Sequence, residues 1–278
     1  MWEPFFAGGP APENGTEEII TSSVSQAWPV PDAGVGAVTY MLEILTGLIG
    51  SARRWRTMPW LVVLFGIMIV PLGAVSIIFI VIQPIVIGTW CTLCLIAAAA
   101  MLLQIPYSLD ELVATGQFLW RRKRAGQDLI RVFFVGDTDE GGREEIEDDF
   151  EQRPRRIIGE MSGGGVALPW NLAVCLLIGA WLMCTRLTLG SGRGMANADH
   201  LIGALVLTVT VSALAEVARP LRFLNMALGA ALLITPFAYG ADWPATVASL
   251  LCGVGLIALS LRRGRIRNRY GSWSKVIV

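Results

Sequence analysis

Long apolar segments separated by short polar connections dominate the chain. A bilayer core is roughly 30 Å thick and a helix rises about 1.5 Å per residue, so a span needs about 20 mostly apolar residues. The segments that approach this length are 34–50, 59–82, 85–106, 167–187, 199–217, 223–240 and 244–261. The first is short and contains Glu43. The pattern predicts an all-α polytopic membrane protein with about seven transmembrane helices.

The polar connections alternate in charge along the chain. One set is basic: 51–57, 119–124, 219–222 and 262–269. The other set is acidic or nearly uncharged: the N-terminal segment, 83–89, 188–198 and 241–243. Because basic loops stay cytoplasmic, we expect the N-terminus and the start of segment 85–106 to lie outside and the C-terminus to be cytoplasmic.

Composition agrees with a lipid environment. Hydrophobic residues make up 54% of the 278 residues and charged residues 16%, whereas soluble domains carry about 25% charge. The formal net charge is zero, so we expect no nucleic-acid partner. The first 35 residues show no signal peptide. Positive charge that is almost all arginine, with abundant Ala and Gly, suggests a GC-rich bacterial genome, and we expect a location in the bacterial plasma (inner) membrane.

Four regions follow from these patterns. We predict a membrane domain at 1–118, a cytosolic hydrophilic linker at 119–165, a four-helix membrane domain at 166–265 and a cytosolic tail at 266–278. Inside the linker, the apolar piece 129–135 is expected to form a strand or an interfacial turn.

The second membrane region repeats itself at a spacing of 50 residues. The matching pairs are Gly179 and Gly229, Leu182 and Leu232, Thr185 and Thr235, Gly190 and Gly240, Leu201 and Leu251, and Gly203 and Gly253. Small residues at equal depth let helices approach closely in lipid, so each unit is predicted to be a helical hairpin. Thr235-Pro236-Phe237 looks like a degenerate copy of a Ser-Pro-Trp motif. With this motif and the repeat, residues 168–262 resemble the SPW-repeat membrane family. The resemblance implies a four-helix module without an established chemistry.

Two polar residues have several interpretations. His200, the only histidine, is expected in a solvated external loop beside Asp199, and one His with one Asp does not make a metal site. Glu43 falls inside an apolar segment, where a charge costs about 2.5–3.5 kcal/mol on insertion scales. It is expected to be protonated, or to face the bundle interior and pair with a polar group such as Thr39 or Thr46. A shallow position and a proton relay are further interpretations.

Cys91 and Cys94 are the closest pair among the five cysteines. At the start of a helix, residues i and i+3 share one face, so the two sulfurs can form a disulfide. The helix N-terminus favours a thiolate there, and an adjacent second thiol is what thiol–disulfide exchange requires. Spacing alone leaves open two structural cysteines, and a zinc site would need further ligands.

Residues 1–115 resemble a vitamin K epoxide reductase domain. The resemblance rests on Ser25 to Gly36, similar to the loop that enters the family's second helix, and on Gly88 to Cys94, similar to the start of its redox-active helix. It implies a four-helix bundle enclosing a quinone, menaquinone or ubiquinone. Cys94 would face the quinone and Cys91 would exchange with a disulfide, while Ser25, Trp28 and Ala98 would line the quinone pocket.

The segment departs from that family in two respects. Residues 1–33 contain no cysteine, so the family's loop pair is missing and a separate thioredoxin-like or other external thiol protein would have to meet Cys91. Only three of the four bundle helices are expected, with an ancestral first helix lost before Met1, so a homo-oligomer partner or lipid would complete the pocket. Ala98 is apolar where some relatives have a quinone-contacting tyrosine.

The favoured hypothesis is a membrane thiol:quinone oxidoreductase that passes electrons from external thiols through Cys91 and Cys94 to a lipid quinone. A non-catalytic membrane scaffold with a degenerate reductase domain is the alternative, favoured by the missing cysteines and helix. A transporter is the third hypothesis, but the repeats lack the broken helices typical of transporters.

Overall fold

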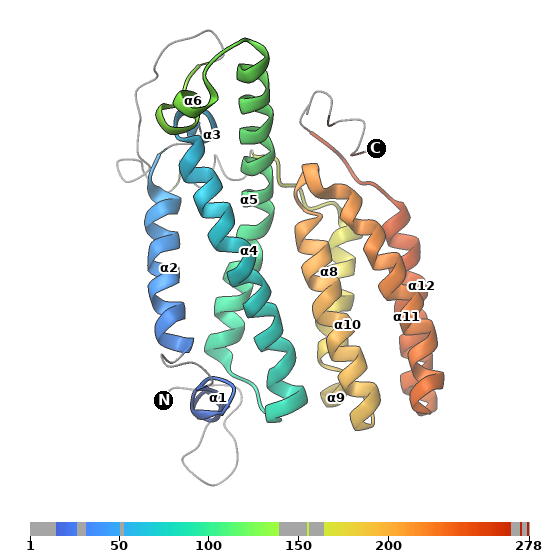
Figure 1. The fold of residues 1–278 in the computed structure, drawn as a ribbon. Helices are drawn as coiled ribbons and strands as arrows, with labels where there is room; N and C mark the ends of the chain where they lie inside the picture. Colours follow the sequence, from blue (N-terminus) through green and yellow to red (C-terminus); the bar gives the residue numbers. More distant parts are fainter. Residues whose placement is uncertain are drawn as a thin grey trace.

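A computed structural model describes residues 15–26, 32–50, 53–138, 155, 164–267, 273 and 277. The first half consists of three long helices and shorter elements (Figure 1). They are α1 (Gly15–Thr21), α2 (Asp32–Leu48), α3 (Arg54–Thr57), α4 (Pro59–Ile82), the π-helix η1 (Gln83–Ile87), α5 (Thr92–Arg124) and α6 (Leu129–Val135). Helix α1 lies beneath the start of α5, and α3 and α6 lie at the opposite end of the bundle.

The second half stands beside the first half, and its long helices run roughly parallel to those of the first half (Figure 1). The elements are α8 (Trp170–Met183), α9 (Thr185–Thr188), α10 (Arg193–Ser212), the 3₁₀-helix η3 (Glu216–Phe223), α11 (Leu224–Tyr239) and α12 (Trp243–Leu261). No strand occurs in the part of the chain that the structure describes.

The predicted all-α membrane architecture is confirmed. Within the described residues, five helical segments are long and apolar enough to cross a membrane, and residues 34–48 and 170–183 form shorter apolar helices. The prediction for 85–106 was wrong in its bounds, because residues 83–87 continue the preceding helix and the next one runs from Thr92 to Arg124. At about 1.5 Å per residue, α5 is roughly 50 Å long and extends beyond one bilayer core.

Helix α6 replaces the strand or turn predicted for 129–135. Asp128 caps it, because its side chain accepts a hydrogen bond from the Ile130 N–H at 3.0 Å. An open apolar hollow of about 340 Å³ lies between α6 and the last turns of α5, and Lys123 is one of the residues that line it. The hollow is therefore at the opposite end of α5 from the first turn of that helix.

The first half has a small core between α4 and α5. Phe65, Ile69 and Met101 are buried there, and Tyr40 of α2 packs against them. Most of α2 is nonetheless exposed, with Met41 at 63% and Ile44 at 62%, as expected of a face that contacts lipid.

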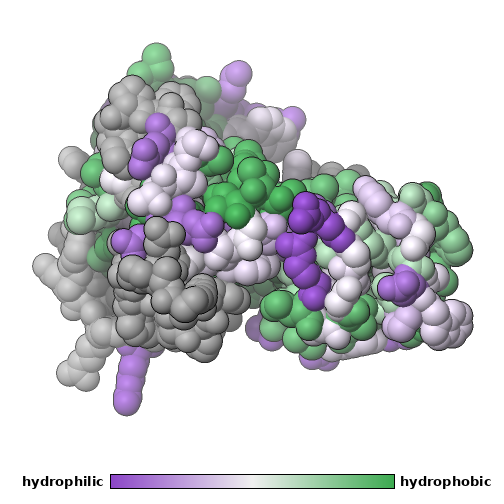
Figure 2. All heavy atoms as spheres, turned by 90° about the horizontal axis from the view of Figure 1, so that it is seen from below, coloured by the Kyte–Doolittle hydropathy of each residue, from purple (hydrophilic) through white to green (hydrophobic). Residues whose placement is uncertain are grey.

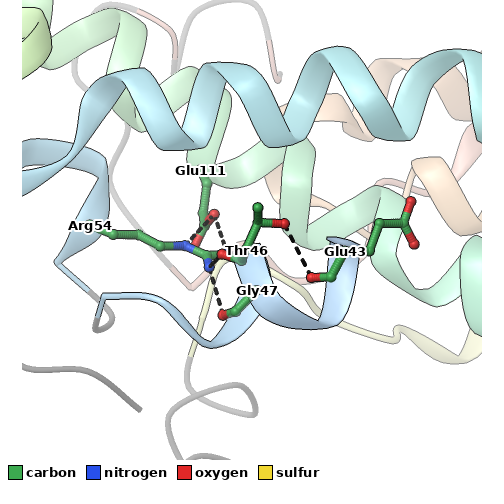
Figure 3. A network of polar contacts seen from close by, with 5 residues as sticks. All are labelled: Glu43, Thr46, Gly47, Arg54 and Glu111. Carbon is green, nitrogen blue, oxygen red and sulfur yellow. Dashed lines mark hydrogen bonds and ion pairs between the residues drawn. The ribbon is translucent and has the colours of Figure 1, made fainter. Parts of the chain in front are cut away.

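Arg54 fastens the end of α2 to α5 (Figure 3). Its Nε and Nη2 donate to the Glu111 carboxylate at 2.8–3.0 Å, and its Nη1 donates to the Thr46 and Gly47 carbonyls at 3.2 and 2.7 Å. These carbonyls belong to the last turn of α2 and have no partner within the helix. One guanidinium therefore pairs with a charge and caps a helix end.

Glu43 is 3% exposed, and its carboxylate points away from the Arg54–Glu111 pair (Figure 3). Among the described residues, neither of its carboxylate oxygens has a hydrogen-bond partner of ordinary geometry. The Thr39 and Thr46 hydroxyls donate instead to backbone carbonyls of α2, so the hydrogen bond predicted from either threonine to this carboxylate was wrong. Thr39 lies in the middle of α2 and Thr46 in its last turn, and back-bonding of a threonine hydroxyl to the preceding turn is an ordinary outcome in a helix.

The second half is two helical hairpins, α8–α10 and α11–α12, in which the repeated glycines meet. A Cβ on Gly203 would lie 2.6 Å from the Gly179 carbonyl oxygen, and one on Gly253 would lie 2.7 Å from the Gly229 carbonyl oxygen. Contact this close leaves no room for a side chain, and it places equivalent residues of both units at one depth. The hairpins share a core, whose buried members are Cys175, Leu182, Ile202, Val206, Leu232 and Leu256.

Candidate redox site

The segment between α4 and α5 creates the candidate site. Pro84 has no N–H and cannot continue the α-helical hydrogen bonding, and the chain widens here into the π-helix η1. Gly88 ends it in the left-handed region at φ +89°, which glycine adopts without strain. Four residues without helical structure then lead to Thr92. The segment therefore turns the chain back between α4 and α5 and presents Cys91 at the start of α5.

Cys91 is the N-cap of α5 and is joined to Cys94 by a disulfide, with their Cα atoms 5.3 Å apart. The expectation that both cysteines lie within the helix was wrong for Cys91, whose backbone is extended at φ −117° and ψ 112°. Its sulfur accepts a hydrogen bond from the Cys94 N–H at 3.1 Å. This N–H is one of the free donors of the helix start, so the cap places sulfur where the helix dipole favours negative charge.

Gln83 holds the backbone of Cys91. Its Oε1 accepts a hydrogen bond from the Cys91 N–H at 3.2 Å, and the side chain is 1% exposed. Sequence reasoning missed this residue, although an uncharged polar residue directly after a long apolar run, and beside a proline, was a usable signal. An unpaired buried amide is costly, so the hydrogen bond helps to fix the position of Cys91.

The two cysteines differ in access. Cys91 is completely buried, whereas Cys94 is partly exposed. Helix α1 contributes to the cover of this segment, because Gly15 packs so tightly against the Trp90 carbonyl that no side chain fits there. On the next residues of α5, Leu93 is 44% and Ile96 58% exposed, an apolar surface suited to lipid.

The remaining predicted site residues lie as follows. Ala98 is buried at 3% exposure, one turn after Cys94 on α5. Ser25 is buried after α1, and its N–H donates to the Ser22 Oγ at 3.3 Å. Trp28 lies outside the described residues.

The prediction for His200 was wrong. It lies in α10 rather than in a loop, and it is 3% exposed. Its ring packs edge-on against the Trp90 ring, with the centroids 5.0 Å apart. Packing between the two halves of the molecule buries it, and nothing in the local sequence indicates such contact. In the described part of the chain, no three His, Cys, Asp or Glu side chains gather as a metal site would require.

Comparison with known families assigns both halves. Residues 10–109 match the Vitamin K epoxide reductase family, and residues 169–263 match the SPW repeat domain. The chain is a fusion of these two families. No curated protein and no solved structure matches it.

Cys91, Cys94 and Gln83 all fall inside the part that matches the reductase family, termed here the reductase domain. The family match, together with the Cys91–Cys94 disulfide, supports a membrane thiol oxidoreductase kind of function. The SPW part, termed here the repeat domain, contains the remaining cysteines, Cys175, Cys184 and Cys252, which are free.

Proposed function

We propose that this protein is a membrane thiol:quinone oxidoreductase in which Cys91 and Cys94 are the catalytic residues. The observation that carries the proposal is the Cys91–Cys94 disulfide at the N-terminus of α5, a helix long and apolar enough to cross a membrane. Two bonded sulfurs at the end of a membrane-spanning helix can meet both a water-soluble thiol and a lipid-soluble acceptor.

The proposed cycle transfers two electrons and two protons. A donor dithiol reduces the Cys91–Cys94 disulfide, which gives a donor disulfide and two thiols in this protein. Those thiols then transfer two electrons and two protons to the quinone, which becomes a quinol, and the Cys91–Cys94 bond forms again. The net reaction oxidises one dithiol and reduces one quinone.

Access favours different roles for the two sulfurs. Cys94 is the proposed partner of the quinone, because it is partly exposed beside the apolar residues Leu93 and Ile96, along which a lipid quinone can approach. Ala98, one turn further on, is buried, and its place in the proposed quinone-binding set rests on resemblance to the family. Ser25 and Trp28 complete the proposed quinone-binding set by resemblance to the family.

Cys91 is the proposed partner of the thiol donor, a thioredoxin-like or other external thiol protein. Because Cys91 is completely buried, this exchange requires its surroundings, where α1 packs against the Trp90 carbonyl, to open. The positive-inside rule supports a location of the Cys91 end on the external side of a bacterial inner membrane. Arginines at 53, 54, 56, 121, 122 and 124 lie toward the opposite end. A homo-oligomer or surrounding lipid would close the bundle beside the exposed α2.

Steady-state turnover tests the proposal. Purified protein in lipid nanodiscs, supplied with dithiothreitol and a short-chain quinone, is expected to form one quinol per oxidised dithiothreitol, well above the rate without protein. Equal rates with and without protein would contradict the proposal.

A non-catalytic scaffold is the second candidate, because residues 1–33 contain no cysteine to relay electrons. A scaffold has no need for a pair that responds to redox conditions. Absence of turnover, with a Cys91–Cys94 bond that persists in excess dithiothreitol, would favour it.

A further inference from the structure

Helix α10 of the repeat domain lies against the reductase domain. It contacts both α4 and α5, and its first turns are at the end of the molecule where α5 begins (Figure 1). Seen from that end, hydrophilic side chains lie at the junction of the two halves, among apolar surface (Figure 2). Two side chains of the repeat domain meet the segment 80–90 of the reductase domain at this junction, Arg186 and His200.

His200 satisfies a backbone carbonyl that the sequence leaves without its usual donor. In a regular α-helix the N–H of residue 84 would donate to the carbonyl of Ile80, but residue 84 is proline. The His200 Nε2 lies 3.2 Å from that carbonyl oxygen. Since a carbonyl only accepts hydrogen bonds, Nε2 carries the hydrogen. A side chain of one domain thereby completes the helix end of the other.

The same ring reaches the residue next to the redox pair. The Trp90 and His200 rings meet edge-to-face at an interplanar angle of 81°, an arrangement worth about 0.5–1.5 kcal/mol beyond its buried area. Trp90 directly precedes Cys91. His200 therefore contacts this segment at two places: at Ile80, before the π-helix, and at Trp90, the residue before the N-cap Cys91.

Arg186 supplies a third contact, in the middle of the segment. Its Nη1 donates to the Pro84 carbonyl at 3.3 Å, and its Nη2 donates to the Asn197 Oδ1 at 2.9 Å. Pro84 follows Gln83, whose side chain accepts the Cys91 N–H. The contacts at Ile80, Pro84 and Trp90 thus lie on both sides of Gln83, whose side chain binds the Cys91 N–H, and directly before Cys91 itself.

We propose that the repeat domain positions the redox pair, and that His200 is the positioning residue. This proposal rests on the proposed function, because it assigns the repeat domain a role at the same pair. The contacts hold the segment in the conformation in which Cys91 and Cys94 are bonded. Loss of His200 frees this segment, so the two thiols meet less often and the disulfide becomes easier to reduce. The effect acts through backbone position, without chemistry at His200.

The disulfide equilibrium tests this directly and needs no quinone. Full-length protein in nanodiscs is equilibrated with mixtures of reduced and oxidised dithiothreitol, alkylated, and analysed by mass spectrometry for the Cys91–Cys94 bond. His200→Ala is expected to lower the equilibrium constant for the bond about tenfold, which corresponds to about 30 mV for a two-electron couple. His200→Gln, which keeps an N–H donor, is expected to recover part of the loss.

Asn225→Ala is the matched control within the repeat domain. Asn225 is completely buried and donates to the Thr210 Oγ1 at 2.9 Å, so its loss should lower the Tm and leave the disulfide equilibrium unchanged. Arg186→Ala changes an exposed residue and should shift the equilibrium in the same direction as His200→Ala, but less, even if His200→Ala does not fold.

Unchanged equilibrium constants in both His200→Ala and Arg186→Ala, or an equal shift in Asn225→Ala, would overturn the positioning role. A shift in His200→Ala without any quinone turnover in the wild type would retain the positioning role and reject the proposed function. The two claims therefore fail separately.

Discussion

Replacing Cys94 with alanine is expected to abolish quinone-dependent oxidation of dithiothreitol. The disulfide cannot form without the second sulfur, so neither the exchange with a donor nor the transfer to quinone has a path. Cys91→Ala is expected to be equally inactive. The measurement is quinol formation by purified protein in nanodiscs, followed by absorbance, with the rate without protein subtracted.

Cys184→Ala is the control for this loss, because Cys184 is an exposed free cysteine outside the redox pair. Its activity should equal that of the wild type. Full activity in Cys94→Ala would show that the pair does not carry the electrons. Loss of activity in Cys184→Ala would instead assign the role to the Cys184 thiol.

The second large effect is expected in the repeat domain, on stability. Gly203→Leu places a side chain where even a Cβ would lie 2.6 Å from the Gly179 carbonyl oxygen. Overpacking typically costs about 1–3 kcal/mol, and here the obstacle is backbone that a rotamer change cannot avoid. The hairpin α8–α10 is expected to separate, with a Tm lowered by many degrees in the same lipid.

Gly116→Leu is the matched control, since Gly116 also lies in a spanning helix but a Cβ added there would meet nothing within 4 Å. Its Tm should stay the same or rise, because leucine favours helix over glycine by up to about 1 kcal/mol. Equal Tm values for the two variants would contradict close glycine packing as the basis of the hairpin.

Features that depend on local composition could be predicted from the sequence. Apolar length alone located the spanning helices, and the 50-residue repeat placed Gly179 and Gly203 where the structure brings them together. The spacing of Cys91 and Cys94 likewise showed that a bond between them was possible, and the structure contains that bond. In each case the determining residues are neighbours in the chain or recur with a fixed period.

Features that depend on contact between distant segments could not be predicted. His200 looked like a solvated residue because its burial comes from Trp90 and Ile80, more than 100 residues earlier in the chain. Segment 85–106 looked continuous, since hydropathy does not register that the preceding helix continues through Pro84 and ends only at Gly88. The cover that α1 provides beside Cys91 comes from residues too few and too acidic to suggest a buried helix.

The central claim is that electrons pass from the Cys91 and Cys94 thiols to a quinone, and one single-turnover measurement tests it most directly. Wild-type protein in nanodiscs is fully reduced, and the reductant is then removed under anaerobic conditions. The reduced protein is mixed with one equivalent of quinone, alkylated and analysed by mass spectrometry. We predict that one quinol forms per protein and that Cys91 and Cys94 alone become resistant to alkylation. Quinol formation with both thiols still alkylated, or two thiols that persist beside unreduced quinone, would contradict the account.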